Sequence, residues 1–403
     1  MNVNFQHEIV RKVLYVFLTI FFLYSFWYQY AFSPIGGVFS FLGAIILLLS
    51  IMNIRFSWYY YRDFLPIVIF IVLLIFTAFF LSFFPEAAIT RATSVFEYLI
   101  PMLGIFTYVD SNLRQFQKIL TSLSWTITIL AISSLILGHK TNTGAIAIGS
   151  LNVNVEASLL SLGFVSNIIL LGMKDSTRFY KLFLLISTVL LFKAEIDCAS
   201  RRGFVVAAFV LSLGFLFLFV KWFKGKPILK FLVILVTGIT AISLASSLYE
   251  ALRSTALFTR FLNTGYTGDT GRVVLKQKAF ELFIKAPLFG AGMGAVEKIA
   301  GYYSHSFYYE LLGCTGLLGF LLIMYILLRH FFGYIRLCIK FKNNDDTYED
   351  NVLFVVKGII LLICSILIGG VAVVYIYDMY FYVMISLMLS ADSIITNTTR
   401  FYE

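Results

Sequence analysis

The sequence predicts an all-α membrane protein: one integral membrane domain over residues 1–403, built as a polytopic bundle of about twelve transmembrane helices. Of its residues, 60 % are hydrophobic and only 13 % are charged, whereas a soluble domain carries about 25 % charged residues. A soluble core could not cover so much apolar surface, but lipid can. Because a span needs about 20 apolar residues, the 403 residues hold about twelve spans and one sizeable loop.

Twelve apolar runs mark the expected spans. Every backbone N–H in lipid needs an internal partner, so we expect helices rather than open strands. The first run follows Arg11 and Lys12 and has no small-residue cleavage site, which favours an uncleaved span over a signal peptide. The seventh run is short and is the weakest of the set. The runs cover 13–32, 35–54, 64–84, 92–109, 119–138, 155–173, 180–194, 203–220, 228–248, 307–328, 352–374 and 376–395.

Basic residues predict that both termini are cytoplasmic. In that orientation the inner loops hold eighteen Lys and Arg residues and the short outer loops hold five, in agreement with the positive-inside rule. The loop 249–306, between spans nine and ten, then lies outside and holds seven basic residues. A loop of this length is translocated largely regardless of charge, but its charge also suits an anionic ligand. We therefore expect this large extracytoplasmic loop to carry part of an active site.

Several protein classes are disfavoured. The net charge of +10 follows the loop topology and does not indicate a nucleic-acid partner. Four cysteines show no paired spacing, so we expect neither a disulfide framework nor a metal site. The chain has no tandem repeat and no convincing inverted repeat, which weighs against a two-half transporter.

Two arginines mark the outer junction of the seventh and eighth runs, in the sequence Ser200-Arg201-Arg202-Gly203. Charged side chains at the mouth of a helix bundle are expensive to desolvate and indicate function. Guanidinium groups match phosphate oxygens in a bidentate fashion and stay charged at any working pH. The alternative is that both side chains extend to the membrane interface.

The large loop contains a second candidate, Gly268-Asp269-Thr270-Gly271-Arg272. Its glycines predict a turn, and Arg272 opens an amphipathic helix that runs to about Lys285. Phe280, Phe283 and Ile284 would lie on the face toward the membrane or the core. The alternative is an ordinary interfacial helix with a basic face.

Residues 286–294 bring three spaced glycines, which could let backbone N–H groups approach a phosphate. No strand precedes them, so the pattern does not indicate a nucleotide fold. A tight, packed loop is the better interpretation.

His305 lies where the loop re-enters the membrane, in Ser304-His305-Ser306. Imidazole titrates near neutral pH and is suited to take a proton from a hydroxyl. A structural histidine at a helix cap is the alternative. Asn152 and Asn154 lead into the sixth run and could bind sugar hydroxyls, although a helix cap is slightly favoured.

In order and predicted side, these elements resemble the bacterial O-antigen ligase and polymerase family, the Wzy/WaaL type. That family shows an N-x-N-like helix entry, an S-R element, a G-R pair, a P-x-x-G-x-G turn and an H-N ahead of E-x-x-x-x-x-G-x-x-G. The matching residues lie within about 150–330 and are Asn152 and Asn154, Ser200-Arg201, Gly271-Arg272, Pro287 to Gly294, His305, Glu310, Gly316 and Gly319. Ser306 stands where the family usually has Asn, and Arg202 leaves open which arginine aligns.

The resemblance implies a GT-C-like membrane glycosyltransferase in the bacterial cytoplasmic (inner) membrane, with its active site facing outward. Family members transfer a glycan from undecaprenyl diphosphate. Polymerases pass it to another lipid-linked repeat unit, which builds O-antigen, capsule or exopolysaccharide, and ligases pass it to lipid A-core. The implied partners are an undecaprenyl-diphosphate-linked oligosaccharide, membrane lipid, a chain-length regulator and a flippase, with no cofactor.

The resemblance also implies roles for single residues. His305 would be the base, while Arg272 and Arg201 would stabilise the leaving diphosphate in an inverting, metal-independent displacement. Asp269 would be a fallback base. The residues expected to bind the diphosphate or the glycan are Arg202, Asn152, Asn154, Arg253, Arg260 and Asp269.

Three alternatives stay open. About ten residues separate Gly294 from His305, which leaves little room for a lipid A-recognition insert and favours polymerase over ligase. A transporter or flippase of lipid-linked sugars would need polar residues or broken helices near the bilayer midplane. Lys357 and Asp378 in the last two runs are candidates for that role. A purely structural scaffold would leave the outer arginines unexplained.

Overall fold

A computed structural model of the chain describes residues 3–32, 34–54, 62–141, 144–149, 151–174, 176–233, 235, 253, 255–262, 269–340 and 347–400. This part is overwhelmingly helical, which confirms the all-α class. Its strands are β1 (His139–Lys140) and β2 (Ile146–Ala147), a short antiparallel pair.

Nine helices in the described part are long and apolar enough to cross a membrane, so the chain is a multi-pass membrane protein. The first candidate span continues from α1 through a short π-helix, Tyr24–Tyr28, into α2 (Gln29–Ala31), and the second includes the 3-10 turn Arg62–Phe64. The nine are built on α1 (Val3–Leu23), α5 (Leu65–Phe80), α6 (Pro85–Val109), α7 (Leu113–Leu137), α8 (Val153–Gly172), α10 (Arg201–Trp222), α15 (Phe307–Lys340), α16 (Thr347–Gly369) and α17 (Met379–Arg400).

The other three predicted spans differ from these nine. The second run forms α3 (Val38–Asn53), which is apolar but has only 16 residues. The seventh forms α9 (Arg178–Asp197), which is long enough but too polar to count among the nine. The ninth run, 228–248, lies mostly outside the described residues. The number of twelve spans and the orientation of the chain therefore stay predictions.

The chain divides into two compact units, and we describe each by itself. The first unit comprises Met1–Ser25, Ile35–Ser122 and Gly265–Glu403, and the second comprises Phe26–Pro34 and Leu123–Thr264.

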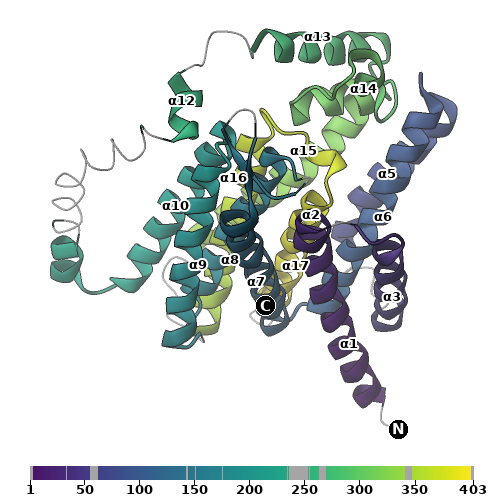
Figure 1. The fold of residues 1–403 in the computed structure, drawn as a ribbon. Coiled ribbons are helices and arrows are strands. Elements are labelled where there is room, and N and C mark those ends of the chain that lie inside the picture. Colours follow the sequence, from purple (N-terminus) through teal and green to yellow (C-terminus); the bar gives the residue numbers. More distant parts are fainter. Residues whose placement is uncertain are drawn as a thin grey trace. The chain divides into compact units, whose positions relative to one another are not determined.

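In the second unit, α8 packs against both α9 and α10 (Figure 1). Every residue of α8 from Glu156 to Gly172 is buried, as expected for a helix that is hydrophobic on all sides. Gly163 lets α8 approach Ile127 and Leu191 closely, because a Cβ at this position would collide with both side chains.

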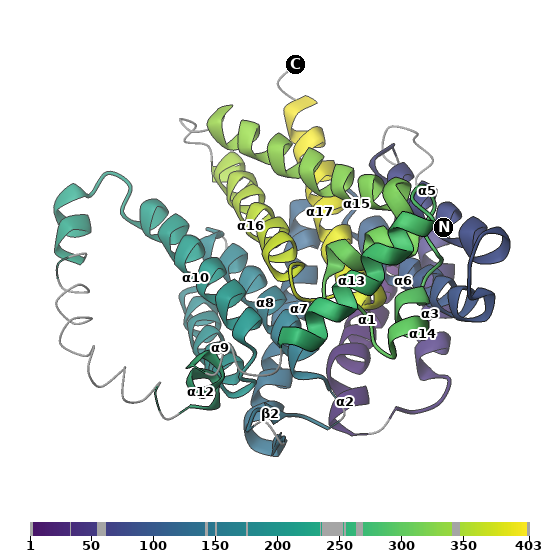
Figure 2. The same ribbon diagram turned by 90° about the horizontal axis from the view of Figure 1, so that it is seen from above.

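In the first unit, α13 (Asp269–Lys285) lies across the end of the long helices rather than along them (Figure 1). It packs on α15, as the view from above also shows (Figure 2). The predicted helix to Lys285 is confirmed, but it begins at Asp269 rather than at Arg272. Residues 269–271 therefore form its first turn, and the separate turn predicted ahead of Arg272 is wrong for these residues. Its buried residues are Ala279 and Leu282 rather than the predicted aromatic set, because Gly313 of α15 approaches the backbone of Ala279. The exposed fractions of Phe280 and Ile284 are 45 % and 64 %, so the core side of the prediction is wrong for these two residues and the membrane side stays a prediction.

Candidate functional site

The glycine turn in the first unit is a packed structural element. Between α13 and α14 (Ala295–Ala300), Gly290, Gly292 and Gly294 all have positive φ. Opposite this turn α15 is broken, because Gly316 has φ +64° and ψ −165°. A Cβ at Gly316 would collide with the backbone at Leu288 and Gly290. The tight, packed loop predicted from the sequence is confirmed.

The turn supplies the hydrogen bonds that the break in α15 removes. The N–H groups of Ala291 and Gly292 donate to the carbonyls of Gly313 and Cys314, each at 3.0 Å. In return, the N–H groups of Leu317 and Leu318 donate to the carbonyls of Pro287 and Leu288. A broken helix inside a membrane protein is tolerated when its backbone groups find partners in this way.

His305 stands immediately before α15 in an unusual backbone conformation. Its φ is +54°, a region that non-glycine residues rarely occupy and that often marks functional positions. The neighbours Ser304 and Ser306 are buried, at 0 % and 2 % exposure, and the Ser304 hydroxyl donates to the Ser306 carbonyl at 2.9 Å. The imidazole itself is half-buried and packs edge-on against the ring of Tyr303, with 4.6 Å between ring centroids.

Glu310 holds the segment 304–306 through a hydrogen bond. Its side chain is fully buried, and one oxygen, Oε2, accepts from the Ser304 N–H at 2.7 Å. The other, Oε1, accepts from the Tyr377 hydroxyl at 2.7 Å. Tyr377 in turn accepts from the Gly294 N–H at 3.1 Å, and burial raises the pKa of Tyr377 well above its usual range, so the hydroxyl stays protonated. One network therefore joins the glycine turn, the start of α15 and the 3-10 turn Tyr375–Tyr377.

Two residues near this network, Arg91 and Glu297, were not selected from the sequence, whereas Asp378 was considered only as a transport residue. Arg91 of α6 forms an ion pair with Glu297 of α14 at 2.6 Å and lies over the ring of Tyr377, 4.8 Å from its centroid. Asp378, which follows Tyr377, accepts from the Tyr380 hydroxyl at 3.2 Å. Burial raises the pKa of Asp378 to about 7. Asp378 lies between the 3-10 turn and α17, outside the last helix, which weakens its case as a midplane transport residue.

Arg272 lies in the first turns of α13 and is half-buried. Within the described part of the chain it forms neither a hydrogen bond nor an ion pair, so its guanidinium keeps its binding capacity. The backbone of Asp269 begins the same helix, and its side chain lies outside the described residues.

In the second unit, Ser200-Arg201 forms the start of α10. The Ser200 hydroxyl accepts from the Gly203 N–H at 3.3 Å, which is the usual role of a serine N-cap. Gly203 is required here by close approach, since a Cβ would meet Glu195 and Ala157. The first turn of α10 thus fits tightly against α8 and α9.

The large loop returns through α12 (Ala256–Leu262) to the start of α10, and we call this region the corner. Leu257 packs with Ala145 and Ala199 in a small hydrophobic cluster. Arg260 donates to the Ala199 carbonyl at 2.7 Å, and Arg201 donates to the Arg260 carbonyl at 3.3 Å. The contacts bring two predicted anion-binding arginines together, and Arg201 has no ion pair among the described residues.

Asn152 and Asn154 belong to the same corner. Asn152 is the N-cap of α8 and accepts from the Asn154 N–H at 2.9 Å, which confirms the favoured cap interpretation. Asn154 Oδ1 accepts from the Ser200 hydroxyl at 3.1 Å, so it links α8 to α10. Arg202 is half-buried and Arg253 is exposed.

Two buried carboxylates near this corner were also not selected as candidates from the sequence. Glu156 of α8 and Glu195 of α9 are both 0 % exposed, and neither carboxylate oxygen of Glu195 has a hydrogen-bond partner in the described part. Cys198 nearby is also buried, and burial raises the pKa of its thiol well above the usual range, so it is not a reactive thiolate.

The described side chains include no group of three or more His, Cys, Asp or Glu residues that could hold a metal ion.

In the comparisons with known proteins, no family model matches the chain and no curated protein matches its sequence. The family resemblance therefore rests on the motifs alone.

Proposed function

We propose that the protein is a glycosyltransferase that polymerises polysaccharide repeat units on the outer face of a bacterial cytoplasmic membrane. It would move a glycan from undecaprenyl diphosphate to the non-reducing end of another lipid-linked repeat unit. The observation that carries this proposal is His305, a non-glycine residue held at positive φ between two buried serines and supported by a fully buried Glu310. Surroundings that impose such a conformation are typical of catalytic positions.

In the proposed step, the acceptor hydroxyl oxygen attacks the anomeric carbon as its bond to the diphosphate oxygen breaks. His305 takes the hydroxyl proton, and undecaprenyl diphosphate leaves with the bonding electron pair. A single displacement of this kind inverts the anomeric configuration. The sugar–diphosphate bond supplies the energy, so no nucleotide is required on the outer face.

Arginines would stabilise the negative charge on the leaving diphosphate. Arg272 supports this role because it makes no competing ion pair among the described residues. Arg201 supports it because its guanidinium donates to the Arg260 backbone carbonyl and has no ion pair among the described residues. Arg260 lies beside it and donates to the Ala199 carbonyl. The step needs no metal if these guanidinium groups neutralise the diphosphate.

A transporter of lipid-linked sugars is the rival from another class. It would use a broken helix whose free backbone groups bind the substrate. The break at Gly316 does not favour that use, because the glycine turn already occupies the exposed groups. The ligase alternative differs only in the acceptor, lipid A-core.

The test is glycan transfer by the purified chain. The protein in detergent is incubated with an undecaprenyl-diphosphate-linked repeat unit, with and without lipid A-core, and the products are separated by length. The variants are His305→Ala and Arg272→Ala, with His139→Ala and Lys285→Ala as matched controls at exposed positions. A parallel reaction contains EDTA.

A ladder of longer lipid-linked glycans without lipid A-core, resistant to EDTA and lost only in the two site variants, is the expected result. Product that requires lipid A-core would make the protein a ligase. Full activity of both site variants, or no transfer from any native donor, would overturn the catalytic assignment and favour the transporter.

A further inference from the structure

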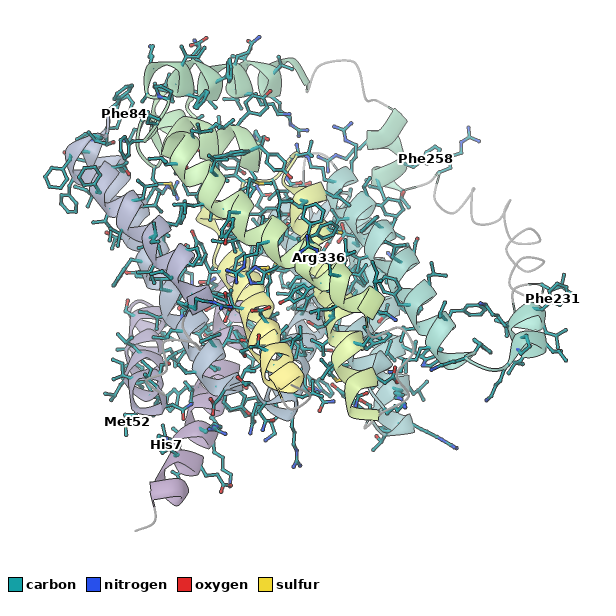
Figure 3. All side chains as sticks on the ribbon, turned by 180° about the vertical axis from the view of Figure 1, so that it is seen from behind. His7, Met52, Phe84, Phe231, Phe258 and Arg336 are labelled. Atoms are coloured by element: carbon teal, nitrogen blue, oxygen red, sulfur yellow. The ribbon has the colours of Figure 1, made fainter. Side chains whose placement is uncertain are left out.

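An open cavity of about 350 Å³ lies in the first unit, between α15 and α17. It is lined by the later part of α15, away from the His305 end of that helix, and Figure 3 labels one lining residue, Arg336. It belongs to the part of α15 that the positive-inside rule places near the cytoplasm. Its lining includes Arg329, His330, Phe332, Tyr334, Arg336 and Asp392. Nothing in the proposed transfer reaction uses these residues.

The charges around the cavity favour an anion. Arg329 forms an ion pair with Asp63 at 2.6 Å, which orients its guanidinium and leaves other N–H groups to donate. Arg336 has neither an ion pair nor a hydrogen bond within the described residues, and it is exposed. The carboxylates near the two arginines are Asp392 in the lining and Asp63, which pairs with Arg329. Arg336 is therefore the cation of the lining that has no carboxylate partner among the described residues.

His330 adds an acceptor to this arrangement. Its side chain is 4 % exposed, and Nδ1 contacts the Ile326 carbonyl at 2.7 Å. A carbonyl can only accept, so Nδ1 carries the proton and the neutral ring presents Nε2 as an acceptor. Nε2 is buried and has no partner among the described atoms. A buried polar atom of this kind is rare without a ligand or water.

Two guanidinium groups and one acceptor match a specific chemical group. A hydrogen phosphate presents anionic oxygens to the arginines and a P–OH that can donate to His330. The cavity wall also contains Phe332, which is 54 % exposed, and Leu337, which offer an apolar surface for an acyl chain. Tyr334 is occupied, because its hydroxyl donates to the Met388 carbonyl at 2.8 Å.

We propose that this cavity binds a phosphomonoester through Arg329, Arg336 and His330. The group can come from a lipid headgroup or from free phosphate, and both would use the same contacts. The apolar wall favours the lipid. This site is independent of glycan transfer, so its failure and the failure of the proposed function are separate results.

The experiment measures binding to the full chain in phosphatidylcholine nanodiscs. One arm titrates fluorescent short-chain phosphatidic acid, and the other titrates inorganic phosphate as competitor. The main variant is Arg336→Ala, because this exposed residue has no described partner and its loss should not disturb folding. Arg114→Ala, another exposed arginine on the predicted inner side, is the matched control. His330→Phe and His305→Ala complete the set, and melting temperatures report folding.

We expect Arg336→Ala and His330→Phe to weaken phosphatidic acid binding about tenfold, the effect of one lost charge-assisted contact. Arg114→Ala and His305→Ala should bind as the parent does. Phosphatidic acid that millimolar phosphate does not displace supports a lipid ligand, and full displacement by phosphate supports a soluble one. Equal binding by the parent and Arg336→Ala, or no binding of either probe, would overturn the site.

Discussion

Two buried carboxylates in this protein have opposite surroundings. In the first unit, Glu310 is fully buried and both of its oxygens accept hydrogen bonds, from Ser304 and Tyr377. In the second unit, Glu195 is equally buried, but neither oxygen has a described partner. A buried polar network that is fully satisfied specifies one local structure, whereas an unsatisfied buried group costs free energy.

The difference indicates two different reasons for placing a carboxylate in an apolar interior. Glu310 holds His305, the glycine turn and the 3-10 turn in one arrangement, so its contribution is structural and its loss should be felt at the site. Glu195 costs free energy of folding, and no described hydrogen bond to its carboxylate offsets that cost. Such a group is kept when the protein uses it, for example in proton transfer or in a state with a ligand bound.

The largest effect is expected from Glu310→Ala. The substitution leaves the Ser304 N–H and the Tyr377 hydroxyl without their acceptor, so we expect a loss of about 3 kcal/mol in the free energy of unfolding. Transfer activity should also fall, because His305 loses its support. Thermal unfolding in detergent measures the first effect, with the exposed Glu86→Ala as control. An unchanged melting temperature would show that the network does not hold the site.

The pH dependence of Asp378 gives the next effect. Burial raises the pKa of this carboxyl from 3.8 to about 7, so the folded state keeps a proton that the unfolded state has lost. Stability should therefore fall as pH rises from about 4 to 7 and level off above that range. Between pH 5 and 7 the expected loss is about 2 kcal/mol.

Comparison with Asp378→Asn isolates this contribution. The melting temperature of the variant should change less over the same pH range than that of the parent. Identical pH profiles for the two proteins would show that Asp378 is not protonated in the folded state.

A smaller loss is expected for Tyr377→Phe. The Gly294 N–H loses its acceptor and Glu310 loses one of its three described donors, while the ring still packs under Arg91. We expect a cost of about 1 kcal/mol, visible as a modest fall in melting temperature. Tyr302→Phe, at a side chain that is 68 % exposed, should have no effect. A larger loss for the control would contradict the role given to the Tyr377 hydroxyl.

The smallest change in stability is expected for Glu195→Met. This side chain has similar volume and removes a buried carboxylate that has no described donor, so stability should stay within about 1 kcal/mol or rise. Reduced transfer activity at retained stability would assign a functional role to Glu195. A strong loss of stability would instead show that the carboxylate is held by contacts and would remove the contrast with Glu310.

Local signals predicted local structure well. The Asn152 cap, the helix that ends at Lys285 and the packed glycine turn each depend on a few adjacent residues, and the structure contains all three. Apolar runs located most of the long helices for the same reason. The burial of α13 was less predictable, because Gly313, on another helix, decides which face is covered.

The support of the candidate site was not predictable from local patterns. Tyr377 and Glu310 are 67 residues apart, and Arg91 and Glu297 are 206 apart. No short-range periodicity encodes such contacts, which depend on how α6, α15 and the last 3-10 turn pack. The same holds for Arg260, which reaches the Ala199 carbonyl only because α12 folds back onto the corner.

The break in α15 also limits which parts of the loop ahead of this helix can move. If the glycine turn lifted away, four backbone bonds would be lost at Gly313, Cys314, Leu317 and Leu318, and each uncompensated group in an apolar surrounding costs several kcal/mol. The turn therefore cannot work as a gate that opens and closes in each reaction cycle. Hydrogen exchange at the Leu317 and Leu318 amides should be as slow as in an unbroken helix, and any movement that admits a substrate has to take place in other segments.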